Sequence, residues 1–468
     1  MGKLKNKFRW RDIVFIALLI KIIYWLFRWG KHNPGKKGFK IDEKLEADFL
    51  PGQLIIMRKE GVTKAQFEQW KQENLRSLNI EFVKVCGNCD NSLELWKGDN
   101  VLVFIQGVEK IASGGQSSGS TVEGGGETPI AYFCLNFIVN TPESFLDECE
   151  RDKYNFEEGR IEPPPPATGA LVTIGILDTG VLSAIKNEYT KPVTGSCIDN
   201  GEKGWNFVDK NAITTDDNDI RHGSLVAKFV IDQALKYRNH PINILPVKVH
   251  DSEGKSDLFS ILCGLAYASS CGAQVINASF GFYAKQKSGA PSLLQTFVEK
   301  HLVAKNILLI AAAGNQNVVE DSDFLAYSTG NPRDLDVHPF YPASFAAQFE
   351  HVLAATTVRI TAKSASSSPE QNFSDNAVEM GVICDETDSG GHFSFRHPFG
   401  EQVLIYGSSY AAPILTGIIA QHYTELLNAM PGGQFDKTLL LQKLRSLLLT
   451  GTNGKLASFV KDGTSCKK

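Results

Sequence analysis

Between residues 171 and 425, short apolar runs alternate with longer helical stretches, and this alternation restricts the possible folds more than any other feature of the chain. Five runs have the length of buried strands: 171–177, 242–249, 274–278, 307–312 and 352–358. Helical stretches lie between them, for example at 224–236 and 257–270. Apolar strands joined by helices are typical of a parallel sheet with helices on both faces. We therefore expect an α/β domain with three layers.

Polar residues follow two of these runs, at the carboxyl ends where open parallel sheets collect their functional groups. Asp178 closes the first run, and Asn315 follows the fourth. His222 opens a helical stretch. Each of these features is more often structural than catalytic, as a Gly-Asn pair in a turn illustrates. None of the three residues indicates a reaction by itself.

The string Gly-Ser-Ser-Tyr-Ala-Ala-Pro at 407–413 is more specific. A nucleophilic serine at a helix N-terminus benefits from free backbone amides and from the helix dipole, which favour developing negative charge. Pro413 is tolerated in a first turn, because the amides there lack partners within the helix. The alternative is an N-cap serine on a packed helix. The whole string favours Ser409 as a nucleophile. The string Ala-Ala-Ala-Gly-Asn at 311–315 then offers Asn315 as the oxyanion donor, together with the backbone N–H of Ser409.

Seven short strings follow one another along the chain: ILDTGV, HGSLVA, VINASFG, AAAGN, YPAS, NFSDNA and GSSYAAP. In this order they resemble the motifs of the subtilisin-like serine protease family (subtilases), over roughly 160–425. The resemblance implies that Ser409 is the nucleophile, His222 its general base and Asp178 the group that orients the imidazole. It implies that a peptide acylates Ser409 and that water activated by His222 then hydrolyses the acyl-enzyme.

The resemblance also implies a cleft for a peptide or protein substrate. Its residues would be Ser279, Phe280 and Gly281, which pair with an extended peptide, and Ala312, Ala313 and Gly314, which wall the main specificity pocket. The chain departs from the family where Val-Ile-Cys-Asp at 382–385 replaces a strand ending in Ala-Pro-Gly, and where a longer segment separates Asn315 from Ser409. The pocket motifs carry no dense acidic cluster, so we expect fairly broad cleavage after apolar residues rather than after paired basic ones.

Four aspartates precede the histidine motif: Asp209, Asp216, Asp217 and Asp219. Oxygen-rich loops can bind Ca²⁺, and members of the family often do. The preferred interpretation is an ordinary solvated acidic loop, so we expect neither a metal nor another cofactor. The net charge of −4 gives no indication of nucleic acid as a partner.

Residues 1–30 combine a basic N-terminus with an apolar segment at 13–29. A membrane-spanning helix needs about 20 apolar residues, and this segment is at the short end of the range. A cleaved signal peptide is the alternative, but no small-x-small cleavage site follows. We expect a single-pass membrane anchor, followed by a basic linker at 31–45. Basic residues flank the segment almost evenly, so the positive-inside rule does not orient it.

Residues 46–150 are expected to form a small α+β domain before the catalytic domain at 160–430 and a C-terminal helix and tail at 431–468. Strand-like runs at 53–57, 80–85, 92–96, 101–105 and 131–138 accompany a helical stretch at 63–77. The domain loosely resembles the family's N-terminal prodomain. The resemblance implies an intramolecular inhibitor whose tail, around 139–160, occupies the cleft. Self-cleavage in this tail would free the catalytic domain from the anchor.

The nine cysteines are an odd, scattered set, which does not predict a disulfide framework. Cys86 and Cys89 have CxxC spacing, for which a local disulfide or two structural thiols is preferred over half of a zinc site. The cysteines favour the cytosol for the catalytic domain, whereas the family favours the extracytoplasmic side. An active serine endopeptidase is the leading hypothesis. The alternatives are a latent or inactive binding or scaffold protein, and a processing enzyme for one specific partner.

Overall fold

The computed structural model describes residues 49–74, 80–87, 89–98, 129–141, 161–165, 169–193, 197–198, 202–236, 241–283, 289–326, 328–360, 365–449 and 456–458. In this part of the chain, no helix is long and apolar enough to cross a membrane. The predicted anchor at 13–29 and the linker at 31–45 lie outside the described residues.

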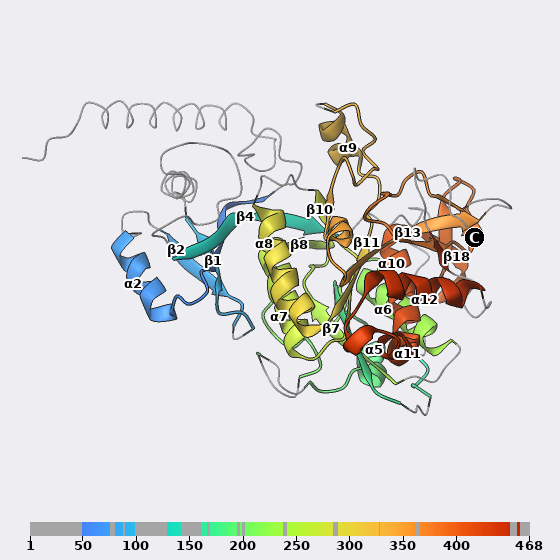
Figure 1. Ribbon diagram of the computed structural model, residues 1–468, viewed down its shortest axis with the longest axis horizontal. Coiled ribbons are helices and arrows are strands. Elements are labelled where there is room, and N and C mark those ends of the chain that lie inside the picture. The colour runs from blue at the N-terminus through green and yellow to red at the C-terminus, as the bar shows by residue number, and fades with distance from the viewer. Residues whose placement is uncertain are drawn as a thin grey trace, which may run out of the picture. The chain divides into compact units, whose positions relative to one another are not determined.

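A nine-stranded sheet forms the centre of the molecule (Figure 1). Its strands in spatial order are β19 (Leu456–Ser458), β15 (Met380–Ile383), β13 (Val352–Ile360), β11 (Leu308–Ala312), β9 (Val275–Ala278), β5 (Val172–Asp178), β7 (Ile242–Lys248) and β6 (Trp205–Asn206), with β14 (Ala365–Ser367) paired to β13. The pairs from β15 to β6 are all parallel, and β14 and β19 pair antiparallel. All five predicted strands are confirmed. Every residue of β5, β7, β9 and β11 is buried, which explains their predominantly apolar sequences.

Helices cover both faces of this sheet, so the prediction of three layers is confirmed. On one face α6 (His222–Leu235) packs against α10 (Ser408–Gln421), and α10 lies on β9, β11 and β13. On the other face α7 (Leu258–Ser270) contacts β5 and β7 and packs against α8 (Ala290–Phe297). Residues 161–458, which contain the predicted catalytic domain, are called the catalytic part. Its other described α-helices are α5 (Ser183–Tyr189), α9 (Val318–Leu325), α11 (Tyr423–Asn428) and α12 (Lys437–Leu449).

Short strands fill the long segment between Asn315 and Ser409. The strands β16 (Glu386–Thr387), β17 (Phe393–His397) and β18 (Gly400–Tyr406) form a separate antiparallel sheet that leads directly into α10. A two-stranded ladder joins β10 (Phe282–Tyr283) to β12 (Phe340–Tyr341). The string Val-Ile-Cys-Asp at 382–385 covers the last two residues of β15 and the two that follow. The strand β15 therefore stands where the family has an apolar strand ending in Ala-Pro-Gly.

The N-terminal part forms a second, antiparallel sheet in the order β2 (Glu81–Val85), β3 (Leu93–Lys97), β1 (Phe49–Arg58), β4 (Ile130–Asn140) and β8 (Lys255–Asp257). The helix α2 (Lys64–Asn74) precedes β2. These elements confirm the predicted helix and every predicted strand of this region except 101–105, which lies outside the described residues. The strand β8 belongs to the catalytic part, so one sheet joins both parts of the chain.

Two disulfides also join the N-terminal part to the catalytic part. Cys86 is bonded to Cys263 in α7, and Cys89 to Cys197. The predictions of a local Cys86–Cys89 disulfide and of no disulfide framework are therefore wrong. The partners lie 177 and 108 residues away in the sequence, and CxxC spacing carries no information about contacts of that range. Of the described cysteines, Cys134, Cys271 and Cys384 have no disulfide.

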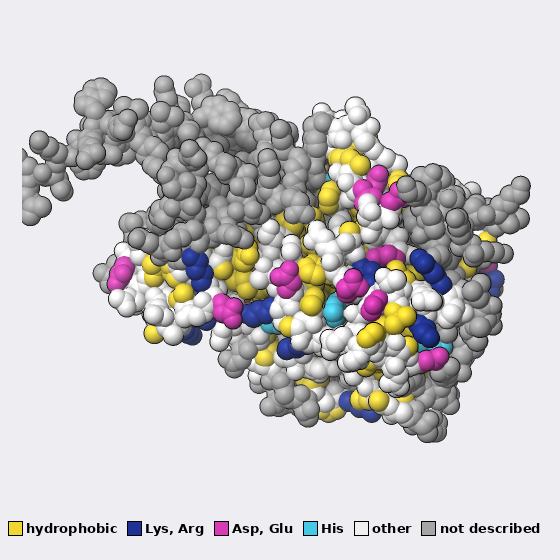
Figure 2. Space-filling model, in the orientation of Figure 1, with side chains coloured by type: hydrophobic (Ala, Val, Ile, Leu, Met, Phe, Trp, Pro, Cys, Tyr) yellow, Lys and Arg dark blue, Asp and Glu magenta, His cyan; other side chains and the backbone are white. Residues whose placement is uncertain are grey.

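A buried ion pair lies at the same junction. Asp90 is 3% exposed and contacts both Lys300 and His301 at 2.8 Å. Burial alone would raise the pKa of Asp90, but the hydrogen bonds from His301 and Lys300 lower it well below its usual range. Elsewhere on the face shown in Figure 2, acidic and basic side chains are interspersed.

Candidate active site

Asp178 and His222 meet where a strand ends and a helix begins. Asp178 is the last residue of β5, and His222 is the first residue of α6. The Nδ1 atom of His222 lies 2.8 Å from Oδ1 of Asp178, and the two residues are 1% and 0% exposed. The backbone N–H of Thr179 donates to the same carboxylate oxygen at 2.8 Å.

Burial and mutual charge act in opposite directions on this pair. Burial would raise the pKa of Asp178, but the charge and hydrogen bond of His222 outweigh it and lower that pKa. Burial would likewise lower the pKa of His222, but Asp178 raises it by its charge and its hydrogen bond. An ionised aspartate beside a basic imidazole is the arrangement that a general base needs.

Ser409 lies in the first turn of α10, which packs along α6. Its carbonyl oxygen accepts a hydrogen bond from Oγ of Ser279 at 2.8 Å. The neighbouring Tyr410 ring lies 5.8 Å from the His222 ring, between centroids. Within the described residues, neither Oγ of Ser409 nor Nε2 of His222 has a hydrogen-bond partner, although both atoms are buried. The serine oxygen and the imidazole nitrogen are therefore uncommitted to other groups.

Ser408 fixes the orientation of Asn315. The backbone N–H and the hydroxyl of Ser408 donate to Oδ1 of Asn315 at 2.9 and 3.0 Å. The hydroxyl oxygen accepts from the backbone N–H of Gly314 at 2.9 Å. The amide nitrogen of Asn315 consequently lies on the side of Gly407. A Cβ added to Gly407 would be 2.8 Å from this nitrogen. Gly407 also has φ of 132°, so a side chain there would be both strained and in the way of the amide.

Asp216 links the segments that carry Asp178 and His222. Its Oδ2 accepts from the backbone N–H and the hydroxyl of Ser224 at 2.8 and 2.6 Å. Its Oδ1 accepts from the hydroxyl of Thr179 at 2.9 Å, and the Thr179 oxygen in turn accepts from the N–H of Gly223 at 2.9 Å. Burial raises the pKa of Asp216 in spite of these hydrogen bonds.

Asp216 is fully buried, so its assignment to a solvated acidic loop is wrong. The other aspartates behave differently: Asp217 is exposed and pairs with buried Lys248 at 2.7 Å, Asp209 accepts from Asn206, and Asp219 is exposed. No cluster of three acidic, histidine or cysteine side chains suited to a metal ion occurs among the residues that the structure describes. The sequence analysis did not predict that Asp216 links these segments. The available signal was a hydroxyl residue in the aspartate motif (Thr179) and another in the histidine motif (Ser224), since both donate to Asp216.

The same reasoning also missed His250, which follows β7 beside Asp178. It is fully buried, and its ring lies 5.1 Å from the ring of Phe280. Burial lowers the pKa of His250 to about 3, in spite of the nearby Asp178 charge, so its imidazole is neutral at physiological pH. Its backbone N–H donates to the carbonyl oxygen of Asp178 at 3.2 Å.

The predicted substrate-binding residues lie at the carboxyl ends of two adjacent strands. Ser279, Phe280 and Gly281 follow β9, while Ala312 ends β11 and Ala313 and Gly314 follow it. The chain's own β4 lies beside the first segment: Asn140 and Gly281 exchange backbone hydrogen bonds of 3.4 and 3.1 Å. The next residue, Thr141, donates to the carbonyl of Gly254 at 3.0 Å.

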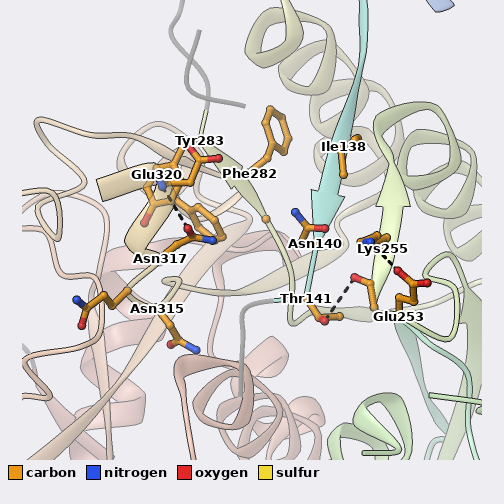
Figure 3. A pocket seen from close by; sticks show the side chains of 14 residues that line it. Ile138, Asn140, Thr141, Glu253, Lys255, Phe282, Tyr283, Asn315, Asn317 and Glu320 are labelled. Atoms are coloured by element: carbon orange, nitrogen blue, oxygen red, sulfur yellow. Dashed lines mark hydrogen bonds and ion pairs between the residues drawn. The ribbon is translucent and has the colours of Figure 1, made fainter. Parts of the chain in front are cut away.

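A cavity of about 300 Å³ opens at this place (Figure 3). Figure 3 shows Asn140 and Thr141 on one side of it and Asn315 and Asn317 on the other. The end of β4 therefore lies in the predicted peptide cleft, between Gly281 and β8.

Comparison with known proteins gives the following likenesses. The sequence profile of the Subtilase family matches residues 169–458. A cell wall-associated protease of Bacillus subtilis (strain 168) is 35% identical over 147 residues, which are 30% of this chain and 15% of that protein. Subtilisin DY of Bacillus licheniformis is 28% identical over 258 residues, which are 54% of this chain and 76% of that protein. A mutant of an epidermin leader peptide processing serine protease from Staphylococcus aureus has the same fold, with 17% identity, a TM-score of 0.50 and coverage of 83% and 98% of the two chains.

Proposed function

The chain belongs to the subtilase family and is a serine protease, and from this premise we propose that it is an endopeptidase with Asp178, His222 and Ser409 as its triad. The observation that carries the proposal is the buried contact of 2.8 Å between Asp178 and His222, beside the helix that presents Ser409. His222 removes the proton of Ser409 as the serine attacks a peptide carbonyl, and returns it to the leaving amine. Asp178 holds the imidazole in one orientation and stabilises its positive charge.

Asn315 and the backbone N–H of Ser409 stabilise the oxyanion of the tetrahedral intermediate. This role is supported by the two hydrogen bonds that Ser408 donates to Oδ1 of Asn315, because they fix the plane of the side-chain amide. A donor that is oriented before the reaction costs no reorganisation when the charge develops, and removal of one such donor costs about 10²–10³ in kcat.

The N-terminal domain is an intramolecular inhibitor. The pairing of Asn140 with Gly281 supports this proposal, because Gly281 belongs to the segment expected to pair with substrate. A peptide substrate needs the same backbone groups, so the two occupants compete. The expected tail for cutting, around 139–160, begins within β4, and residues 142–160 lie outside the described residues.

The precursor is held by a single-pass anchor at 13–29, with the catalytic domain on the extracytoplasmic side. Two disulfides support this location, because disulfides persist in oxidising compartments and are rare in the cytosol. The same disulfides bear on maturation. Both cross-links begin before the tail and end after it, so a cut in the tail leaves the two fragments covalently joined. Cutting alone would not free the catalytic domain from its anchor, contrary to the expectation from sequence.

The test compares the wild type with Ser409→Ala under reducing conditions, which break the cross-links to the N-terminal domain, by intact mass and by labelling with a serine-reactive phosphonate. We expect the wild type to take up the label and to yield a C-terminal fragment of the size of the catalytic domain. The Ser409→Ala variant should remain full-length and unlabelled. If the wild type is neither labelled nor cut, the protein is a latent or inactive binding protein, and the endopeptidase proposal is wrong.

A further inference from the structure

The ring of Phe340 lies between the two segments that wall the predicted specificity pocket. A Cβ added to Gly281 would lie 2.3 and 2.4 Å from Cε1 and Cζ of Phe340. A Cβ added to Gly314 would lie 3.0 Å from Cδ1 and Cε1 of the same ring and 2.5 Å from Nδ2 of Asn372. Both glycines thus face one phenyl ring, which occupies much of the space that their missing side chains leave.

The path of a bound peptide passes this place. Asn140 is paired with Gly281 through two backbone hydrogen bonds, which marks where an extended chain lies against the first wall. Phe340 is one of the residues that line the cavity beside this pairing, together with Gly281 and Asn315. A substrate side chain that enters between the two walls therefore meets the Phe340 ring near the predicted oxyanion donor.

The ring is held in position from several sides. Phe340 is 5% exposed, and β12 pairs it with Tyr283 of β10, whose ring centroid lies 4.9 Å away. Its backbone N–H donates to Oγ of Ser344 at 2.9 Å. Behind it the Tyr283 ring stacks on His338 at 4.0 Å. Packed aromatic rings do not move aside without creating a cavity, so a substrate cannot displace Phe340 at small cost.

We propose that Phe340 fills the deep part of the main specificity pocket and restricts cleavage to positions after glycine, alanine or serine. This inference rests on the proposed endopeptidase function and replaces the expected broad cleavage after apolar residues. A pocket can exclude a side chain that is too large far more strongly than it can exclude one that is too small. We expect kcat/KM for a peptide with phenylalanine before the scissile bond to be at least about 100-fold below that of the alanine peptide.

The test uses the full chain, assayed with a reductant that breaks the cross-links to the N-terminal domain, and a peptide series that differs only in the residue before the scissile bond: glycine, alanine, leucine or phenylalanine. Phe340→Ala and Phe340→Gly should raise kcat/KM for the leucine and phenylalanine peptides at least tenfold relative to the alanine peptide. Phe340→Leu keeps most of the buried volume and serves if the smaller variants do not fold; it should show a smaller shift in the same direction. Phe395→Ala, which removes a buried ring that packs against Phe229 of α6, is the control and should leave the order of peptides unchanged.

The outcomes separate this inference from the function on which it rests. If the wild type cuts the phenylalanine peptide as well as the alanine peptide, or if the Phe340 variants keep the wild-type order, the inference is wrong while the endopeptidase stands. If the wild type cuts no peptide and reacts with no phosphonate, the proposed endopeptidase function is wrong, and the inference about Phe340 is wrong with it. Labelling of the wild type by an alanine phosphonate but not by its phenylalanine counterpart supports both.

Discussion

Asp216 makes no hydrogen bond to Oγ of Ser409, yet its carboxylate holds the two segments that carry Asp178 and His222. One oxygen accepts from Ser224, two residues after the histidine, and the other from Thr179, directly after Asp178. All of these groups are buried, so no water replaces a bond that is lost. We infer that Asp216 is a positioning residue for the pair.

Asp216→Asn should lower both stability and turnover. Each oxygen of Asp216 accepts from a backbone N–H, that of Ser224 or that of Asn218. In the asparagine variant, the side-chain NH₂ group would replace one oxygen and face one of these donors, with which it cannot form a hydrogen bond. We expect a loss of about 1–3 kcal/mol in the free energy of unfolding, which urea denaturation would measure. Active-site titration with a phosphonate separates misplacement of His222 from simple loss of folded enzyme, because only misplacement lowers kcat per titrated site.

Asp219→Asn is the matched control, since Asp219 is exposed and lies in the same loop. Its stability should change by less than about 0.5 kcal/mol. An Asp216→Asn variant with wild-type kcat per titrated site would show that Asp216 stabilises the fold without positioning the pair.

At the scale of elements, the site is built where strand ends and helix starts meet. The strands β5 and β11 end at the same edge of the sheet, and α6 and α10 begin there. Ser408 joins the end of β11 to the start of α10 through Gly314 and Asn315. The position of Ser409 thus depends on the hydroxyl group of its neighbour.

Ser408→Ala should therefore weaken catalysis without removing any triad group. It removes the acceptor of the Gly314 N–H and one of the two donors that Ser408 offers to Oδ1 of Asn315. We expect a loss of about 1–3 kcal/mol in stability and a lower kcat with little change in KM, because the oxyanion donor loses its orientation. Ser408→Thr keeps the hydroxyl and should restore most of the kcat. If Ser408→Thr is as slow as Ser408→Ala, the packing of the methyl group matters more than the hydrogen bonds.

The elements differ in how far the sequence predicted them. The runs at 171–177 and 307–312 correspond closely to β5 and β11, because strands buried on both faces are mostly apolar. The strands β8, β10 and β12 were not predicted, because they are two or three residues long and exist through their partners rather than their composition. The motifs indicated Asp178, His222 and Asn315 as site residues, and the structure places Asp178 at the end of β5, His222 at the start of α6 and Asn315 after β11. No motif indicated Phe340, because its role depends on its contact with Gly281, which is far away in the sequence.

At the scale of the whole molecule, three kinds of contact that hold the N-terminal domain to the catalytic part differ in whether they can dissociate. The strand β4 pairs with β8, Asp90 is held by Lys300 and His301, and two disulfides cross the junction. The first two contacts can dissociate, whereas the third cannot without a reductant. A tethered inhibitor rebinds at an effective concentration far above that of a free one. A cut tail would consequently leave the protease inhibited until the disulfides are reduced.

Removal of the disulfides should convert this tethered inhibitor into a dissociable one. After self-cutting, the wild type should run as one covalent species on a non-reducing denaturing gel and as two fragments after reduction. Replacement of Cys86 and Cys263 by serine should leave the fragments joined through Cys89–Cys197, and the reciprocal pair of replacements should leave them joined through Cys86–Cys263. Only the variant with all four serines should separate without reductant, and its peptidase activity should exceed that of the oxidised wild type. Fragments that separate from the wild type without reductant would contradict the cross-links, and equal activity in the two proteins would show that the N-terminal domain does not inhibit.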